Sequence, residues 1–114
     1  MSRSGDHAEA LAAAYLERQG LQIVERNYRC RQGEIDLIMR ENGTLVFVEV
    51  RLRSNSRFGG AAESITQQKQ EKILQAARHY LAGQRKLPQC RFDAVLLGAL
   101  DGDTIEWLKN AFTE

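Results

Sequence analysis

The chain has 114 residues, a length that fits one compact domain, and we expect a single domain over residues 1–114. Its hydrophobic content of 43% and charged content of 27% are those of an ordinary globular protein, which excludes an intrinsically disordered chain. The longest near-continuous apolar run, residues 45–50, is far shorter than the roughly 20 residues of a membrane-spanning helix. The first residues lack the apolar stretch of a secretory signal. We therefore expect a cytoplasmic protein with no membrane partner.

The formal net charge of +1 hides a marked asymmetry along the chain. Residues 1–50 have a net charge of −2, residues 51–93 of +6 and residues 94–114 of −3. Of the 16 basic residues 12 are arginines, and arginine binds phosphate groups with two parallel hydrogen bonds. The basic middle segment therefore favours an anionic partner, although a basic helix face exposed to solvent would produce the same charge pattern.

Two cysteines, Cys30 and Cys90, are separated by 60 residues and belong to no metal-binding motif. Because two such cysteines make neither a zinc site nor a disulfide framework, we expect both to be reduced thiols, as in a cytoplasmic protein.

A helix is predicted to begin at Asp6 and to end just before Gly20. Asp6 and Glu9 have the spacing of a capping box, in which two side chains bind the free amides of the first helical turn. Apolar residues follow at helical spacing, and Gly20 suits the position just after the last helical residue.

Two strands are predicted next, over residues 21–29 and 34–40, with a turn at Gln32-Gly33 between them. The second strand alternates in character, so that one of its faces is predicted to be apolar: Ile35, Leu37 and Met39.

Asn42-Gly43 is the strongest hairpin signal in the chain and leads to a third strand over residues 44–53. The first half of this strand is apolar on both faces, which predicts a central, buried position in the sheet. Residues 54–60 form a polar, glycine-rich loop without the ending of a phosphate-binding P-loop. A long helix is then predicted over residues 63–83.

A fourth strand over residues 91–100 and a fifth over 104–108 are joined by a turn at Asp101-Gly102. The element order is therefore α-β-β-β-α-β-β, with a helix crossing from the third strand to the fourth. This order predicts an α/β fold with a mixed central sheet of about five strands flanked by helices.

The turn at Asn42-Gly43 fixes the register of the second and third strands, so that positions whose numbers add to 85 lie opposite each other. Asp36 is then opposite Glu49, and Glu34 is opposite Arg51. All four side chains are predicted on one sheet face, with directly opposed Cβ atoms about 4.5–5.5 Å apart.

Two opposed carboxylates on a mostly apolar strand pair destabilise the sheet unless something compensates their charge. One carboxyl group can keep a proton through a strongly raised pKa. Alternatively, Arg51 and Glu34 can form a charge network around the pair, or a divalent cation such as Mg²⁺ can bind between the carboxylates. The spacing alone leaves these three explanations open.

The residues around this pair resemble a known nuclease core. Gly33-Glu-Ile-Asp36 and Val46-Phe-Val-Glu49-Val-Arg51 look like the D…ExK motif of the PD-(D/E)XK nuclease superfamily. A wider set of residues resembles the bacterial YraN family, which is largely uncharacterised and similar to archaeal Holliday junction resolvases. That set comprises Asp6-His-Ala-Glu9, Arg26-Asn27, Gly33-Glu-Ile-Asp-Leu-Ile38, Phe47-Val-Glu-Val-Arg-Leu-Arg53, Phe58-Gly59, Lys69 and Arg91-Phe-Asp93.

This resemblance implies a restriction-endonuclease-like fold and a site for Mg²⁺ or Mn²⁺. Asp36 and Glu49 would be metal ligands, with the Val50 carbonyl as a third. Glu9 matches an acidic position that supplies a ligand in some relatives, although the capping box explains Glu9 equally well.

Arg51 would be the third catalytic residue, but it stands where the superfamily has lysine. Arginine can stabilise charge on a phosphate, but it stays protonated and does not readily move a proton. Lys69 on the second helix is either a displaced catalytic lysine or an ordinary solvated one. Asp93 is predicted to pair with Arg91 rather than to bind metal.

Several basic residues are predicted to contact the phosphate backbone beside this site: Arg53, Arg57, Lys69, Lys72 and Arg78. The function predicted first is a metal-dependent endonuclease acting on DNA, with branched or junction DNA implied by the resemblance. The alternatives are a nucleic-acid-binding module with weak or no catalysis, favoured by Arg51, and an interaction protein whose basic helix meets an acidic partner. Analogy with resolvases also implies a homodimer.

Overall fold

The computed structural model describes residues 3–52, 65–98 and 104–112, and the elements within them follow the predicted order. They are α1 (Arg3–Arg18), β1 (Gln22–Cys30), β2 (Gly33–Glu41), β3 (Thr44–Leu52), α2 (Gln67–Leu81), β4 (Gln89–Leu97) and β5 (Ile105–Phe112). The helix predicted to begin at Asp6 begins three residues earlier, and the fifth strand extends four residues beyond its predicted end.

The strands form one five-stranded sheet in the order β1-β2-β3-β4-β5. The pairs β1–β2, β2–β3 and β4–β5 are antiparallel, while β3 and β4 are parallel and connected through α2. The predicted α/β architecture, a mixed central sheet flanked by helices, is therefore confirmed. It is also the architecture that the resemblance to the nuclease superfamily implies.

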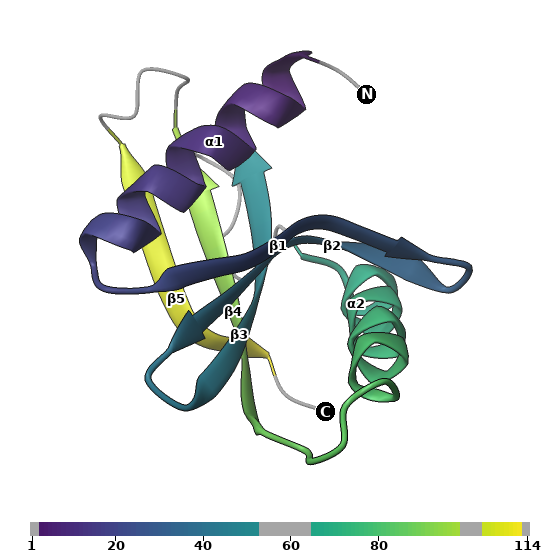
Figure 1. Ribbon diagram of the computed structural model, residues 1–114. Helices are drawn as coiled ribbons and strands as arrows, with labels where there is room; N and C mark the ends of the chain where they lie inside the picture. The colour runs from purple at the N-terminus through teal and green to yellow at the C-terminus, as the bar shows by residue number, and fades with distance from the viewer. Residues whose placement is uncertain (1–2, 53–64, 99–103, 113–114) are drawn as a thin grey trace.

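The two helices cover opposite faces of the sheet. Ala12 and Leu16 of α1 pack against Val46 and Val48 of β3 in one apolar cluster. On the other face, α2 packs on a second cluster that includes Phe47. Figure 1 shows α1 lying across the strands, and α2 beside the turn that joins β1 and β2. Within the described ranges, no helix combines the length and hydropathy needed to cross a membrane.

The register of β2 and β3 is the predicted one over the described ladder. Pairs run from Glu41 with Thr44 to Leu37 with Val48, and each pair of numbers adds to 85. Asn42 in the turn has a φ of 56°, the left-handed conformation that hairpin turns of this type require.

The predicted alternation of side chains between the two sheet faces is interrupted near the start of β2. Leu37 and Met39 pack in the cluster under α1, but Ile35 packs in the cluster under α2, so the prediction that all three share one face is wrong. The pleat changes at Asp36, beyond the last β2–β3 pair. Across from Asp36 in the β1–β2 ladder lies Asn27, whose φ of 52° interrupts the extended strand.

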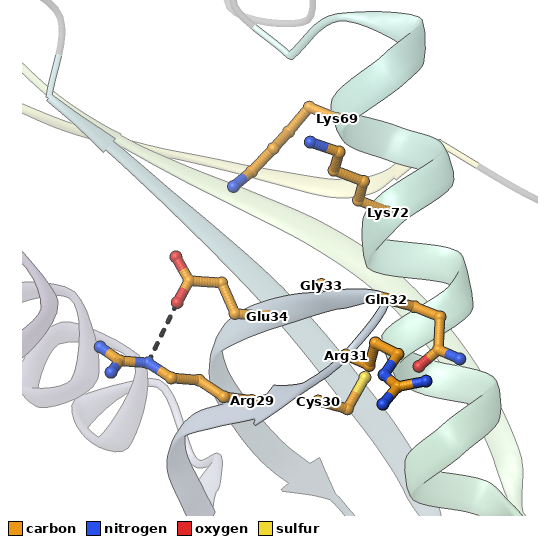
Figure 2. A pocket seen from close by; sticks show the side chains of 8 residues that line it. All are labelled: Arg29, Cys30, Arg31, Gln32, Gly33, Glu34, Lys69 and Lys72. Atoms are coloured by element: carbon orange, nitrogen blue, oxygen red, sulfur yellow. Dashed lines mark ion pairs between the residues drawn. The ribbon is translucent and has the colours of Figure 1, made fainter.

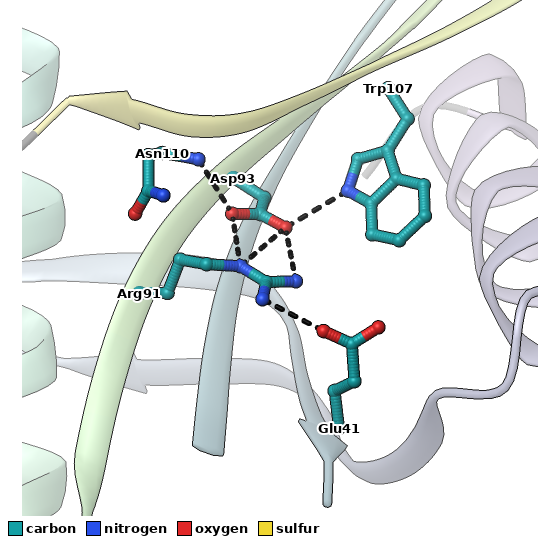
Figure 3. Close-up of polar contacts among 5 residues, drawn as sticks. All are labelled: Glu41, Arg91, Asp93, Trp107 and Asn110. Carbon is teal, nitrogen blue, oxygen red and sulfur yellow. Dashed lines mark hydrogen bonds and ion pairs between the residues drawn. The ribbon is translucent and has the colours of Figure 1, made fainter.

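A buried charge network ties β2, β4 and β5 together (Figure 3). Asp93 is 0% exposed and accepts hydrogen bonds from the Arg91 side chain, from Trp107 Nε1 at 2.9 Å and from the Asn110 amide at 3.0 Å. Arg91 also donates from Nη1 to Glu41 Oε1 at 2.8 Å. The predicted pairing of Asp93 with Arg91 is confirmed.

This network marks the irregular part of the β4–β5 ladder, where the register shifts between Phe92 and Ala94. Asn110 has a φ of 53° there, and its amide points to Asp93 instead of to a strand carbonyl. The carboxylate of Asp93 therefore supplies the acceptors that the interrupted ladder lacks, and its role is structural.

We predict that Asp93→Asn lowers the free energy of unfolding by about 3 kcal/mol, because it leaves the largely buried Arg91 without its main counter-charge. Trp107→Phe removes one donor only, and we expect a loss of about 1 kcal/mol. Urea unfolding of both variants measures the difference. An Asp93→Asn variant as stable as the wild type would contradict a structural role for this network.

Candidate functional site

The candidate site lies where β2 and β3 separate. The ladder of paired residues ends at Leu37 and Val48. One residue further along β2, the side chain of Asp36 forms the hydrogen bond to β3 instead of the backbone. Asp36 Oδ2 accepts a hydrogen bond from the Val50 amide at 2.8 Å. The carboxylate thus replaces a strand carbonyl, which fixes the Asp36 side chain beside β3.

Glu49 lies next to Asp36 and is almost completely buried, with 3% of its surface exposed. Its side chain lies on the α2 face of the sheet, where Lys69 of α2 forms an ion pair with it. Lys69 Nζ lies 3.7 Å and Arg51 Nε 3.5 Å from Glu49 Oε2. Two carboxyl groups and two cations from β2, β3 and α2 therefore meet in one place.

Within the part of the chain that the structure describes, two buried polar atoms of this cluster have no hydrogen-bond partner: Glu49 Oε1 and Arg51 Nε. Such atoms are rare in native proteins, since an unpaired buried polar group costs roughly 1–3 kcal/mol. The cluster is therefore incompletely satisfied by the protein itself, and Glu49 Oε1 is available as an acceptor or a metal ligand.

The pKa of Glu49 is raised from its ordinary value of 4.5 to about 8, first by burial and then by the charge of the neighbouring Asp36 carboxylate, with which it shares a hydrogen bond. Lys69 and Arg51 oppose this shift, with the smaller effect. In the metal-free protein the Glu49 carboxyl group therefore keeps a proton near neutral pH.

Glu34 does not join this cluster. Its carboxylate pairs with Arg29 Nε at 3.2 Å, across the β1–β2 ladder, so the prediction that it faces Arg51 is wrong. The reason is that β2 has already left β3 at Asp36, and its remaining residues pair only with β1. Lys69, not Glu34, completes the charge network with Arg51.

Two further metal ligands were predicted, Glu9 and the Val50 carbonyl. Glu9 is half-buried in α1, the helix on the opposite sheet face, and its metal-binding role stays a prediction. Among the described residues, no three His, Cys, Asp or Glu side chains form a group that could hold a metal ion. The amide of Val50 bonds to Asp36, while the role of its carbonyl is untested.

The basic residues predicted on α2 separate into two sets. The Thr66 side chain caps α2 by accepting a hydrogen bond from the Lys69 amide at 3.1 Å. The first turn of the helix therefore begins beside the site. Lys69 and Lys72 lie together there, but Arg78 is nine residues from Lys69, which places it about 180° around the helix. Arg53 and Arg57 lie outside the described residues.

Lys69 and Lys72 line two adjoining hollows. The smaller, of about 240 Å³, we call the site hollow; it is completed by Arg51, Thr66 and Gln68. The larger, of about 400 Å³, lies between the β1–β2 turn and α2, and we call it the hairpin hollow (Figure 2). Its other lining residues are Arg29, Cys30, Arg31, Gln32, Gly33 and Glu34.

The hairpin hollow was not predicted from the sequence. Arg29 and Arg31 come shortly before the predicted turn at Gln32-Gly33, and this basic pair was the available signal. The contact between that turn and α2 is not encoded by any local pattern, so the two arginines could not be connected to Lys72 from the sequence.

Fold and site together define a small α/β protein with a mixed sheet in which the buried Glu49 and the half-buried Asp36 lie next to basic side chains. The chain belongs to the family described as uncharacterised protein family UPF0102, the YraN family, whose model matches residues 8–97. The resemblance to this family is thereby confirmed.

Individual relatives match over nearly the whole chain. A UPF0102 protein of Nitrosomonas europaea is 59% identical over 110 residues, covering 96% of this chain and 93% of the relative. One from Methylobacillus flagellatus is 54% identical over 113 residues, covering 99% of each chain. One from Cupriavidus metallidurans is 61% identical, covering 97% of this chain and 81% of the relative.

The raised pKa of Glu49 predicts a pH-dependent stability in the absence of divalent cations. Between its ordinary value of 4.5 and about 8, the folded state holds a proton that the unfolded state has lost, so stability falls as pH rises. Glu49→Gln mimics the protonated acid, and we expect this variant to lose the corresponding slope, about 1 kcal/mol per pH unit.

Urea unfolding in a chelator at several pH values between 5 and 8 measures this slope. Glu17→Gln, an exposed glutamate of α1, is the control and should follow the wild type. Parallel curves for the wild type and Glu49→Gln would show that Glu49 carries no extra proton.

Proposed function

We propose that this protein is a divalent-metal-dependent endonuclease that hydrolyses phosphodiester bonds in DNA. Branched or junction DNA is the substrate that the resemblance to resolvases implies. The observation that carries this proposal is the buried Glu49, which has an unpartnered oxygen and touches Asp36 beside two cationic side chains.

The donor set fits a hard cation. Mg²⁺ and Mn²⁺ prefer carboxylate oxygens and are often held by only one or two of them, with water and substrate phosphate as further ligands. Asp36 and Glu49 would hold the ion, and Glu9 and the Val50 carbonyl are the further ligands implied by the resemblance. A cation bound here would supply Lewis acidity for the scissile phosphate and would acidify water.

The residues of the chain supply the rest of the chemistry. Arg51 stays protonated and can stabilise negative charge on the phosphate, but it cannot take up a proton. Lys69 reaches the same carboxylate from α2, so its ammonium group lies where it can orient water and stabilise charge. We therefore assign to Lys69 the role that the superfamily gives to the lysine two residues after the glutamate.

A nucleic-acid-binding module with little or no catalysis remains the second candidate function. It is favoured by one observation, the arginine at position 51, whose Nε has no hydrogen-bond partner even though it lies close to Glu49. The two functions differ in whether Asp36, Glu49 and Lys69 affect a reaction or only binding.

We predict that the protein cleaves junction, flap or linear DNA with Mg²⁺ or Mn²⁺, and that Asp36→Asn and Glu49→Gln each lower the rate at least about 100-fold. Both variants keep the shape of the side chain, and an asparagine oxygen can still accept from the Val50 amide. Lys69→Met should lower the rate similarly, with partial rescue in Lys69→Arg. Lys86→Met, an exposed lysine outside the site, is the matched control.

Cleavage that is unchanged in Asp36→Asn and Glu49→Gln would contradict this site. DNA binding without cleavage of any substrate, by a wild-type protein that also fails to bind Mn²⁺ in titration calorimetry, would establish the second candidate function instead.

A further inference from the structure

The hairpin hollow is formed by two elements in direct contact. Gly33 lies so close to α2 that an added Cβ would be 2.7 Å from the Lys72 carbonyl oxygen. Further along β1, a hydrogen bond joins Tyr28 Oη and His79 Nδ1. The ring of Tyr28 also packs edge-to-face on Tyr80, with centroids 5.2 Å apart. The hollow is therefore preformed by the docking of the β1–β2 hairpin on α2.

The hollow is suited to an anion. Among the described residues that line it, four are cationic and come from both elements, and the one carboxylate, Glu34, already pairs with Arg29. Figure 2 shows Lys69 extending from α2 toward the side of Glu34, and Lys72 extending beside α2 toward Lys69. An anion bound here would meet an excess of positive charge, and arginine and lysine are the side chains that contact phosphate oxygens.

The size of the hollow indicates more than a phosphate group. A volume of about 400 Å³ lies in the range of pockets that enclose a whole small molecule. Apart from Cys30 and Gly33, its described lining residues are polar or charged, which favours a polar ligand. A guanidinium group such as that of Arg31 can stack on a nucleobase as well as bind phosphate.

The hairpin hollow continues the site hollow, since Lys69 and Lys72 line both. A phosphate backbone that enters at Arg51 and Glu49 and continues past the two lysines reaches the β1–β2 turn. We propose that the hairpin hollow binds an unpaired nucleotide next to the phosphate at the Asp36–Glu49 pair. The substrate is then a nucleic acid that is single-stranded beside the cleaved bond, because a base held in a duplex cannot enter such a pocket.

This inference rests on the proposed function for the identity of the neighbouring phosphate, but its test does not need cleavage. Fluorescence anisotropy in a chelator measures binding of a short single-stranded oligonucleotide and of the matching blunt duplex. We expect tighter binding of the single strand, weakened several-fold by Arg31→Gln and by Lys72→Gln. Each lost phosphate contact lowers the slope of log K against log salt by about 0.7 for single strands.

Two further variants sharpen the test. Glu34→Gln removes the one carboxylate from the hollow and should strengthen single-strand binding. Arg40→Gln removes an exposed arginine near the other end of β2, outside both hollows, and should bind like the wild type. Gly33→Ala changes no charge but forces the turn away from Lys72, so it should weaken single-strand binding more than duplex binding.

Three results would overturn the inference: Arg31→Gln and Lys72→Gln behaving like Arg40→Gln, equal losses for single strand and duplex, or Glu34→Gln weakening the binding. None of these three results would contradict the endonuclease proposal, which depends on Asp36, Glu49 and Lys69. Conversely, an inactive protein whose single-strand binding depends on Arg31 would refute the proposed catalysis and support the hairpin hollow.

Discussion

The hydrogen bond from the Val50 amide to Asp36 Oδ2 is the interaction on which the arrangement of the site depends. Two strands in the middle of a sheet cannot separate without leaving backbone groups unpaired, and an unpaired buried amide is costly. Asp36 provides the missing acceptor from its side chain. The strands can then diverge, and the β1–β2 end of the sheet reaches α2 instead of continuing beside β3.

Two buried carboxylates in this protein differ in how fully the surrounding groups satisfy their oxygens. Asp93 is completely buried, and both of its oxygens accept hydrogen bonds from arginine, tryptophan and backbone donors. Glu49 is buried almost as deeply, yet one of its oxygens has no partner, and its neighbour is a second carboxylate. A satisfied network stabilises the fold, whereas an unsatisfied, like-charged pair reduces stability and is typical of sites that bind something.

Much of the fold and the centre of the site could be predicted from local signals. The Asn42-Gly43 turn determines the β2–β3 register, and this register, which ends at the pair of Leu37 and Val48, leaves Asp36 and Glu49 as the next residues of the two strands. The face of Ile35 and the partner of Glu34 could not be predicted, because both depend on where β2 leaves β3, a point that no residue pattern marks. Helical periodicity places Arg78 about 180° around α2 from Lys69, and its predicted contact with the phosphate backbone stays a prediction.

Lys69 shows what tertiary structure adds to the sequence motif. In the sequence it is one of two lysines on a polar helix face, 20 residues after Glu49. Only the crossover that places α2 against the sheet brings its ammonium group to the carboxylate. The same helix carries Lys72 and supports the β1–β2 turn through Gly33. The charge at the carboxylate pair and the shape of the hairpin hollow therefore depend on one docking contact, so that loosening the hairpin from α2 disturbs both.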